Sequence, residues 1–227
     1  MSFYARLQAE TADQRKELLK ARIIQEALCG RIQLSQYVAF LTEAYHHVKH
    51  TVPLLMACGG RLPQRLNWLR DSIAEYIEEE RGHDEWILSD INACGADAAD
   101  VRVGKPGLEA EVMVAFAYHQ IDRENPVGFF GMVHVLEGTS QAVASNAAAA
   151  IQGALQLPEK AFTYLVSHGS LDVEHGRFFE SLMNRLEASE DQSAVVHCAR
   201  SFYRLYGDVF RSLPSYESPT VASGAEQ

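Results

Sequence analysis

The segment HGSLDVEH at residues 168–175 contains three side chains that can bind a metal ion. His168, Asp172 and His175 are separated by four and three residues, so an α-helix would place them on one face. The same face carries apolar residues on both sides of the segment, at Leu165, Phe179 and Leu182. We therefore predict that the three polar groups point into the protein, where charged groups need a partner such as a metal ion.

A second segment, EYIEEERGHDEWILSDI, contains Glu80 and His83 three residues apart, again on one helical face. Glu-x-x-His on a helix recurs in the di-iron carboxylate sites of helical bundles. A solvated run of charges is the alternative interpretation, but Tyr76 and Trp86 add apolar bulk beside it. A glycine inside a helix costs about 1 kcal/mol relative to alanine. The close approach of another backbone or a ligand would explain why Gly82 stands there despite this cost.

The third segment, GFFGMVHVLEGTSQAVA, places Glu137 among apolar residues. An unpaired carboxylate would be costly there, and binding to a metal ion would remove the cost. His134 lies one turn earlier and is a candidate for a further ligand or for a group that orients a ligand. A hydrogen-bonded histidine of the core is the alternative for His134.

The three segments together offer three imidazoles and three carboxylates, from Glu80, His83, Glu137, His168, Asp172 and His175. Mixed nitrogen and oxygen ligands without thiolate suit iron or manganese better than a structural zinc ion. Six ligands are too many for one catalytic ion with an open position, but they suit two ions bridged by a carboxylate. The residues therefore predict a dinuclear metal centre.

Helical periodicity dominates the chain and strand-like alternation is nearly absent. The long helical segments are expected at about 9–28, 33–58, 63–93, 108–123, 126–153, 158–186 and 191–212. We expect interruptions near Pro53 and Gly169, and an internal loop at GADAADVRVGKPG. The prediction is one all-α domain of about seven helices at residues 1–213, followed by a loose tail at 214–227.

Composition narrows the class of protein. The 227 residues are 47 % apolar and 22 % charged, with a net charge of −10, as in a soluble globular protein. The absence of a basic cluster argues against nucleic-acid binding, and no apolar run reaches the ~20 residues that span a membrane. Four scattered cysteines without a CxxC pair, and a start unlike a signal peptide, predict free thiols and a cytoplasmic location.

The segments EEERGHDEWILSDI, GMVHVLEGTS and HGSLDVEH resemble, in that order, the three ligand segments of the heme-oxygenase-like di-iron oxidases and oxygenases. That superfamily shares its seven-helix fold with TenA thiaminases, PqqC-type quinone synthases and CADD-type proteins. The resemblance covers roughly residues 15–212. It implies the same six ligands, with Glu79 as an alternative to Glu80 because the spacing in this segment varies among relatives.

The resemblance also implies an activity. Two iron ions, with manganese as a possible substitute, would use O₂ as co-substrate to oxidise a small amine, amino acid or fatty acid, in a biosynthetic pathway and with an unidentified electron donor. The thiaminase branch uses a cysteine nucleophile, and FGMVHVLEG contains none. Two alternatives stay open: a metal-free PqqC-like oxidase and a non-catalytic TenA-like binding or regulatory protein.

Substrate contacts are expected in the segment YVAFLTEAYHHVKHTVPLLM. Tyr45, His46 and His50 are the candidates, and a wet helix face with one buried histidine is the alternative. If His50 binds substrate, its replacement by alanine should weaken substrate binding and leave the iron content unchanged. The apolar segments FFGMVHV and SFYRLYGDVF are candidates for the face of a homodimer.

Overall fold

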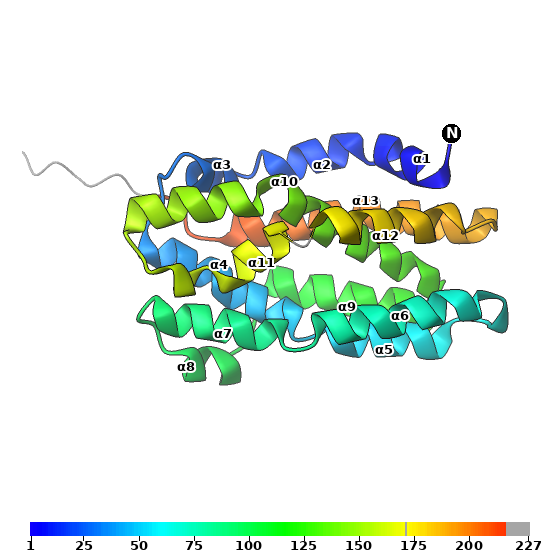
Figure 1. Cartoon of the computed structure of the whole chain (residues 1–227), viewed down its shortest axis with the longest axis horizontal. Helices are drawn as coiled ribbons and strands as arrows, with labels where there is room; N and C mark the ends of the chain where they lie inside the picture. Colours follow the sequence, from blue (N-terminus) through cyan, green and yellow to red (C-terminus); the bar gives the residue numbers. More distant parts are fainter. Residues whose placement is uncertain (171, 217–227) are drawn as a thin grey trace, which may run out of the picture.

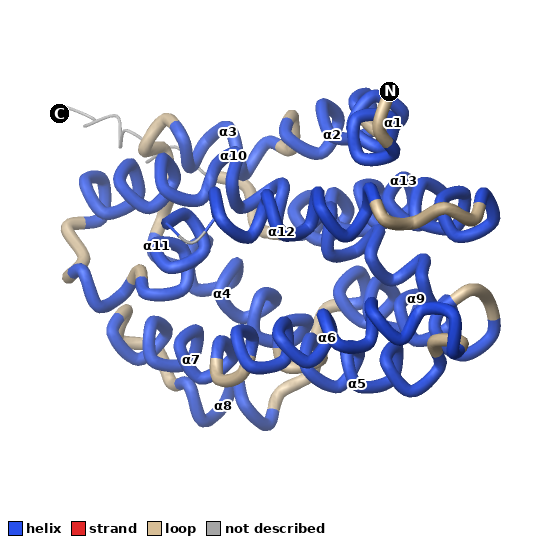
Figure 2. Tube along the Cα trace, turned by 45° about the vertical axis from the view of Figure 1, so that its right-hand side comes forward, coloured by secondary structure: helices blue, strands red, loops and turns tan. Residues whose placement is uncertain are grey.

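The computed structural model describes residues 1–170 and 172–216, and for residues 168–170 and 172–175 it describes the helical backbone but no side chains. Over this part of the chain the protein is built from helices, with no strand (Figures 1 and 2). The predicted all-α class is therefore confirmed. The expected number of seven helices is wrong, because the described residues form thirteen α-helical segments and three 3₁₀ turns. Short breaks divide several of the long helices.

The amino-terminal region shows the first of these breaks. One helix was expected at about 9–28, but three short segments occupy the region: α1 (Phe3–Glu10), α2 (Ala12–Leu19) and α3 (Arg22–Leu28). Thr11 separates the first two, and its buried hydroxyl donates a hydrogen bond to the Leu7 carbonyl oxygen at 2.7 Å.

The next long helix is interrupted close to the expected position. Helix α4 spans Leu34–Val48 and α5 spans Thr51–Arg61, so the break lies just before Pro53. Pro53 occupies the first turn of α5, where the missing N–H has no intrahelical acceptor to lose.

A break that the sequence interpretation missed divides α6 (Asn67–Glu80) from α7 (His83–Ala93). Gly82 lies in the break with φ of 93°, a left-handed conformation that side chains strongly disfavour. A Cβ atom built on Gly82 would meet nothing within 4 Å among the described residues. The expected close approach of another backbone to Gly82 is therefore wrong for the described residues; the glycine is needed for its backbone conformation.

The remaining segments complete the bundle. The predicted loop contains a short helix, α8 (Ala98–Val103), which was not expected. After it come α9 (Leu108–Arg123), α10 (Phe130–Leu155), α11 (Thr163–Ser170), α12 (Asp172–Asn184) and α13 (Ser189–Ser212). The 3₁₀ turns are η1 (Gln64–Leu66), η2 (Pro126–Phe129) and η3 (Glu159–Ala161). The end of α11 and the start of α12 agree with the interruption expected near Gly169.

Helices α10 and α13 pack against each other through the centre of the molecule (Figure 1). They approach closely at Gly131, where a Cβ atom would lie 2.5 Å from the Ala199 backbone nitrogen. Leu165, Phe179 and Leu182 are buried, so the apolar stripe around the 168–175 segment faces the core as expected. Within the described part of the chain, no helix combines the length and apolar character that a membrane span requires.

The segments expected to form a dimer face lie inside the chain's own core. Phe130, Met132, Phe202 and Phe210 are all buried there. These residues are therefore unable to provide an exposed apolar face, and the reason given for a homodimer is wrong, although a homodimer itself stays a prediction. Of the expected tail, residues 217–227 lie outside the described residues.

Candidate functional site

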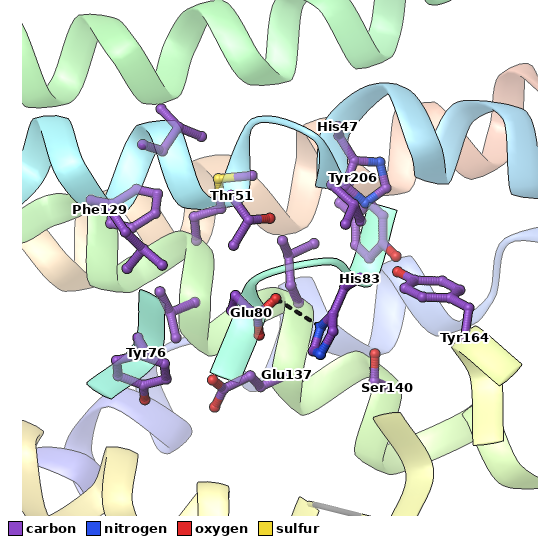
Figure 3. Close-up of a pocket in the computed structure, with 16 residues that line it drawn as sticks. His47, Thr51, Tyr76, Glu80, His83, Phe129, Glu137, Ser140, Tyr164 and Tyr206 are labelled. Atoms are coloured by element: carbon purple, nitrogen blue, oxygen red, sulfur yellow. Dashed lines mark hydrogen bonds and ion pairs between the residues drawn. The ribbon is translucent and has the colours of Figure 1, made fainter. Parts of the chain in front are cut away.

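A cavity of about 80 Å³ lies where the breaks after α4 and α6 face the middle of α10 (Figure 3). Its walls come from α4, α5, α6, α7, η2, α10, α11 and α13. The apolar lining residues are Val48, Leu54, Leu55, Phe129, Met132, Val133 and Leu136. The polar lining residues are His47, Thr51, Tyr76, Glu80, His83, Glu137, Ser140, Tyr164 and Tyr206.

Three of the predicted metal ligands, Glu80, His83 and Glu137, line this one cavity. Glu80 is the last residue of α6 and His83 the first of α7, and a Glu80 carboxylate oxygen lies 3.1 Å from His83 Nδ1. Glu137 reaches the same place from α10 (Figure 3). Glu80 and His83 were expected on one continuous helix; they converge instead across the break at Gly82.

The structure distinguishes Glu79 from Glu80. Glu79 is exposed, whereas Glu80 is half-buried and lines the cavity. The His83 ring is buried and stacks on Trp86, with ring centroids 4.2 Å apart. A fixed imidazole ring beside a carboxylate is a suitable arrangement for binding a metal ion.

Tyr76 adds a hydroxyl group next to the carboxylates. Burial raises its pKa well above the usual value, and the negative charges of Glu137, Glu79 and Glu80 raise it further. The phenol therefore stays protonated. The buried hydroxyl lies beside the Glu137 carboxylate, so the phenol and this carboxylate interact directly at the wall of the cavity.

The side chains of the other three predicted ligands, His168, Asp172 and His175, lie outside the described residues. A residue before them lines the cavity, and a residue after them packs against a side chain of its wall. Tyr164 lines it from α11, and the Phe178 ring on α12 lies 5.4 Å from the ring of Tyr76. Helix α12 also approaches α10 closely, because a Cβ atom on Gly176 would lie 3.0 Å from Gln141 Nε2.

Asp90 fixes where α11 begins. Its buried carboxylate on α7 accepts the backbone N–H groups of Thr163 at 3.1 Å and Tyr164 at 2.8 Å. Burial raises the pKa of Asp90, and these hydrogen bonds oppose the shift. The contact holds the start of α11 against the helix that begins with His83. The sequence interpretation did not identify Asp90, since nothing in one sequence links it to residue 164.

The segment YVAFLTEAYHHVKHTVPLLM contributes to the cavity wall a histidine other than those expected. Tyr45, His46 and His50 do not line the cavity, but His47 does, with Nδ1 2.9 Å from the Glu43 carbonyl oxygen. His46 Nδ1 lies 3.0 Å from Lys49 Nζ, and His50 Nδ1 lies 3.3 Å from the Tyr118 hydroxyl. The prediction assumed that the helix continues through His50 to a break near Pro53, whereas α4 already ends at Val48.

His134 lies in the core beside the first two helices and α13. Its Nε2 atom is 3.4 Å from the Tyr203 hydroxyl and 3.5 Å from Thr11 Oγ1, and its ring stacks on Phe179. Burial lowers its pKa to about 4. This is the environment of a hydrogen-bonded core histidine, and the residue does not line the cavity.

Among the described residues, no cluster of three or more His, Cys, Asp or Glu side chains has a spacing that would hold a metal ion. Glu80, His83 and Glu137 are thus a partial donor set. The rest of the predicted set belongs to the segment whose side chains the structure leaves undescribed.

A model of one protein family, the iron-containing redox enzymes, matches residues 38–207. The chain belongs to this family. The match includes all three segments that carry the predicted ligands. No curated protein sequence matches the chain.

Solved structures show that this member of the iron-containing redox enzyme family has a heme-oxygenase-like fold. A domain of unknown function with that fold from Shewanella denitrificans is 24 % identical, with a TM-score of 0.81 over 91 % of this chain and 90 % of that one. A heme oxygenase from Leptospira interrogans is 13 % identical, with a TM-score of 0.75 over 94 % and 100 % of the chains. A TenA homologue from Pseudomonas syringae is 10 % identical, with a TM-score of 0.73 over 92 % and 90 %.

Proposed function

We propose that this protein is a non-heme di-iron oxidase or oxygenase that uses O₂ to oxidise a small organic substrate. The observation that carries the proposal is the convergence of Glu80, His83 and Glu137 on one enclosed cavity from three helices. Membership of the iron-containing redox enzymes supports the presence of iron. The fold alone does not distinguish the chemistry, because heme oxygenases and TenA homologues share it.

The described donor groups fit a non-heme iron site. Two carboxylates and an imidazole in an enclosed space are oxygen and nitrogen ligands of the kind that iron and manganese accept. The Tyr76 hydroxyl beside the Glu137 carboxylate is a further polar group at the cavity wall. Under the proposal, Glu80, His83 and Glu137 hold the metal together with His168, Asp172 and His175.

Bound iron would supply the electrons that reduce O₂. The chain's own residues would bind the metal and orient the substrate. The apolar walls, including Leu54, Phe129 and Met132, exclude bulk water from the cavity. Tyr76 stays protonated because of its burial, so its hydroxyl is able to donate a hydrogen bond towards Glu137 and orient that carboxylate.

Anaerobic loading with Fe(II), followed by exposure to O₂, tests the proposal. We expect about two iron ions per chain, the number that a six-ligand carboxylate site holds, and a transient visible absorption after mixing with O₂. Glu137→Gln should fold normally and lose most of the iron. Glu111→Gln, at an exposed position on α9, is the matched control and should bind iron like the parent protein.

Two other results would contradict the proposal. Stoichiometric binding of heme, with a Soret band that Glu137→Gln leaves unchanged, would instead support a heme-dependent enzyme. Failure to bind iron under any condition would favour a metal-free PqqC-like oxidase or a TenA-like binding protein. Asp172→Ala adds a separate check: normal folding with loss of iron supports the metal site, whereas lower stability with unchanged iron indicates a structural ion pair.

A further inference from the structure

A second cavity, of about 70 Å³, lies next to the first one, between α3, α4, α10, α11 and α13. Its walls are almost wholly apolar and include Ile24, Ile32, Phe40, Val143, Ala147 and Ile151. No charged side chain is present among the described residues that line it. We call this second cavity the apolar chamber.

Two polar side chains at the wall of the apolar chamber, Tyr37 and Thr139, already have hydrogen-bond partners, and the other polar lining residues, Ser140, Tyr164 and Tyr206, also border the polar cavity. The Tyr37 hydroxyl donates to the Ala161 carbonyl oxygen at 2.7 Å, and the Thr139 hydroxyl donates to the Val135 carbonyl oxygen at 2.6 Å. A polar or charged ligand group among the aliphatic side chains of the chamber would therefore lose its hydration without finding new partners. Burying an apolar group there raises the binding affinity by roughly three- to fourfold for each methylene.

The chamber and the polar cavity share part of their walls. Ser140, Tyr164 and Tyr206 line both spaces. Figure 3 shows these three side chains together on one side of the polar cavity, with the two tyrosine hydroxyl groups pointing towards each other. A ligand that passes these residues would have one end beside Glu80 and Glu137 and the other end among the aliphatic side chains.

We propose that the apolar chamber binds an uncharged alkyl or aryl group of the substrate, while the group to be oxidised lies in the polar cavity. This inference rests on the proposed function for the role of the polar cavity. It defines the substrate class as amphipathic: a small polar head, either a carboxylate or an amine, with an apolar tail. Substrates with a charged tail, such as lysine or arginine, do not fit the chamber.

Binding of simple amphiphiles to the full-length, iron-loaded protein tests the inference. Calorimetry with alkanoates from butanoate to decanoate, and with the matching alkylamines, measures how affinity depends on tail length. We expect a roughly three- to fourfold gain per methylene, followed by a plateau when the chamber is full. Preference for one of the two series identifies the head group. Lysine should bind more weakly than hexylamine, which has a similar length without the charged tail.

Two variants of α10 test whether the dependence of affinity on tail length arises in the apolar chamber. Ala147→Phe places a ring in the chamber, whereas Ala149→Phe adds the same ring at an exposed position two residues away. The first variant should abolish the gain with tail length and keep the parent iron content, and the second should behave like the parent protein. Octanoate with a terminal trifluoromethyl group adds a direct readout, since its fluorine resonance should shift on binding to the parent protein and not on binding to Ala147→Phe.

A larger chamber provides a test that does not depend on the folding of Ala147→Phe. Ile151→Ala should move the plateau towards longer tails. Affinity independent of tail length, or the same length dependence in Ala147→Phe, would overturn the inference. The proposed function fails in a different way, through absence of iron: amphiphile binding to a chain that takes up no iron would support the chamber and refute the di-iron oxidase.

Discussion

The buried carboxylate of Asp90 on α7 accepts the backbone N–H of Tyr164, the second residue of α11, at 2.8 Å. Through this contact, one helix that lines the cavity fixes the start of another that leads towards His168. Asp90 therefore acts through the backbone, because it positions the start of the helix that carries His168.

Replacement of Asp90 by alanine should lower both stability and iron content. The loss of two hydrogen bonds at the start of a buried helix should cost about 1–3 kcal/mol in the free energy of unfolding, measured by urea denaturation. Iron content should fall because α11 shifts. Asp97→Ala removes the cap of the exposed helix α8 and is the matched control, expected to cost about 1 kcal/mol and leave iron unchanged. Equal iron loss in both variants would argue against a specific role for Asp90.

The neighbouring residues Glu79 and Glu80 provide a second test. Glu80→Gln should lower the iron content per chain, because Glu80 lines the cavity beside His83. Glu79→Gln should leave it unchanged, because Glu79 is exposed. Metal analysis of both proteins after anaerobic loading measures the difference. The opposite order would assign the ligand to Glu79.

Among the histidines, His47 should matter more than His50 for oxidation. His47→Ala removes the imidazole that lines the cavity, and we expect O₂ consumption by the iron-loaded protein to slow at least about tenfold with iron content intact. His50→Ala removes a contact with Tyr118 away from the cavity and should change the rate little. A larger effect in His50→Ala would restore the original prediction from the sequence.

Stability should depend on pH through His134. Burial lowers the pKa of His134 to about 4, below its ordinary value of 6.5, so the folded state holds the neutral ring while the unfolded state binds a proton. Stability is therefore complete above pH 6.5 and decreases as the pH falls towards 4, by roughly 3 kcal/mol for this group. His134→Asn should flatten this dependence. His197→Asn, at an exposed site on α13, should preserve it.

The left-handed conformation of Gly82 leads to a prediction about the stability of the fold. Gly82→Ala forces a side chain into the left-handed region and should destabilise the fold by about 1–2 kcal/mol, although no described atom would clash with it. Gly153→Ala lies inside helix α10 at an exposed position with equally open surroundings, and should stabilise the fold by up to about 1 kcal/mol. Thermal unfolding of both variants separates the effect of backbone conformation from that of space.

The sequence predicted the helical class, and it identified three polar residues that line one cavity, because both depend on local patterns; the role of these residues as metal ligands stays a prediction. Glu137 stood out as a carboxylate among apolar residues, and it does line the cavity. His50 does not line the cavity, because the helix that begins at Leu34 ends at Val48 and the helical phase of the histidines does not continue to His50.

The contact of Asp90 with Tyr164 joins residues 74 positions apart. No local pattern encodes a contact over that separation, so Asp90 was missed. Gly82 was noticed but misinterpreted, since a lone glycine in a sequence does not reveal whether space or backbone conformation requires it.

The interrupted helices also determine how the backbone around the cavity opens. His47 and Thr51 flank one break, and Glu80 and His83 flank another. The first N–H groups of α5 and α7 have no intrahelical acceptor, unlike those in the middle of each helix. Amide hydrogens there should therefore exchange with deuterium through small local fluctuations, while α10 and α13 exchange only in larger openings. The lining of the cavity can then rearrange around a ligand without unfolding of the bundle.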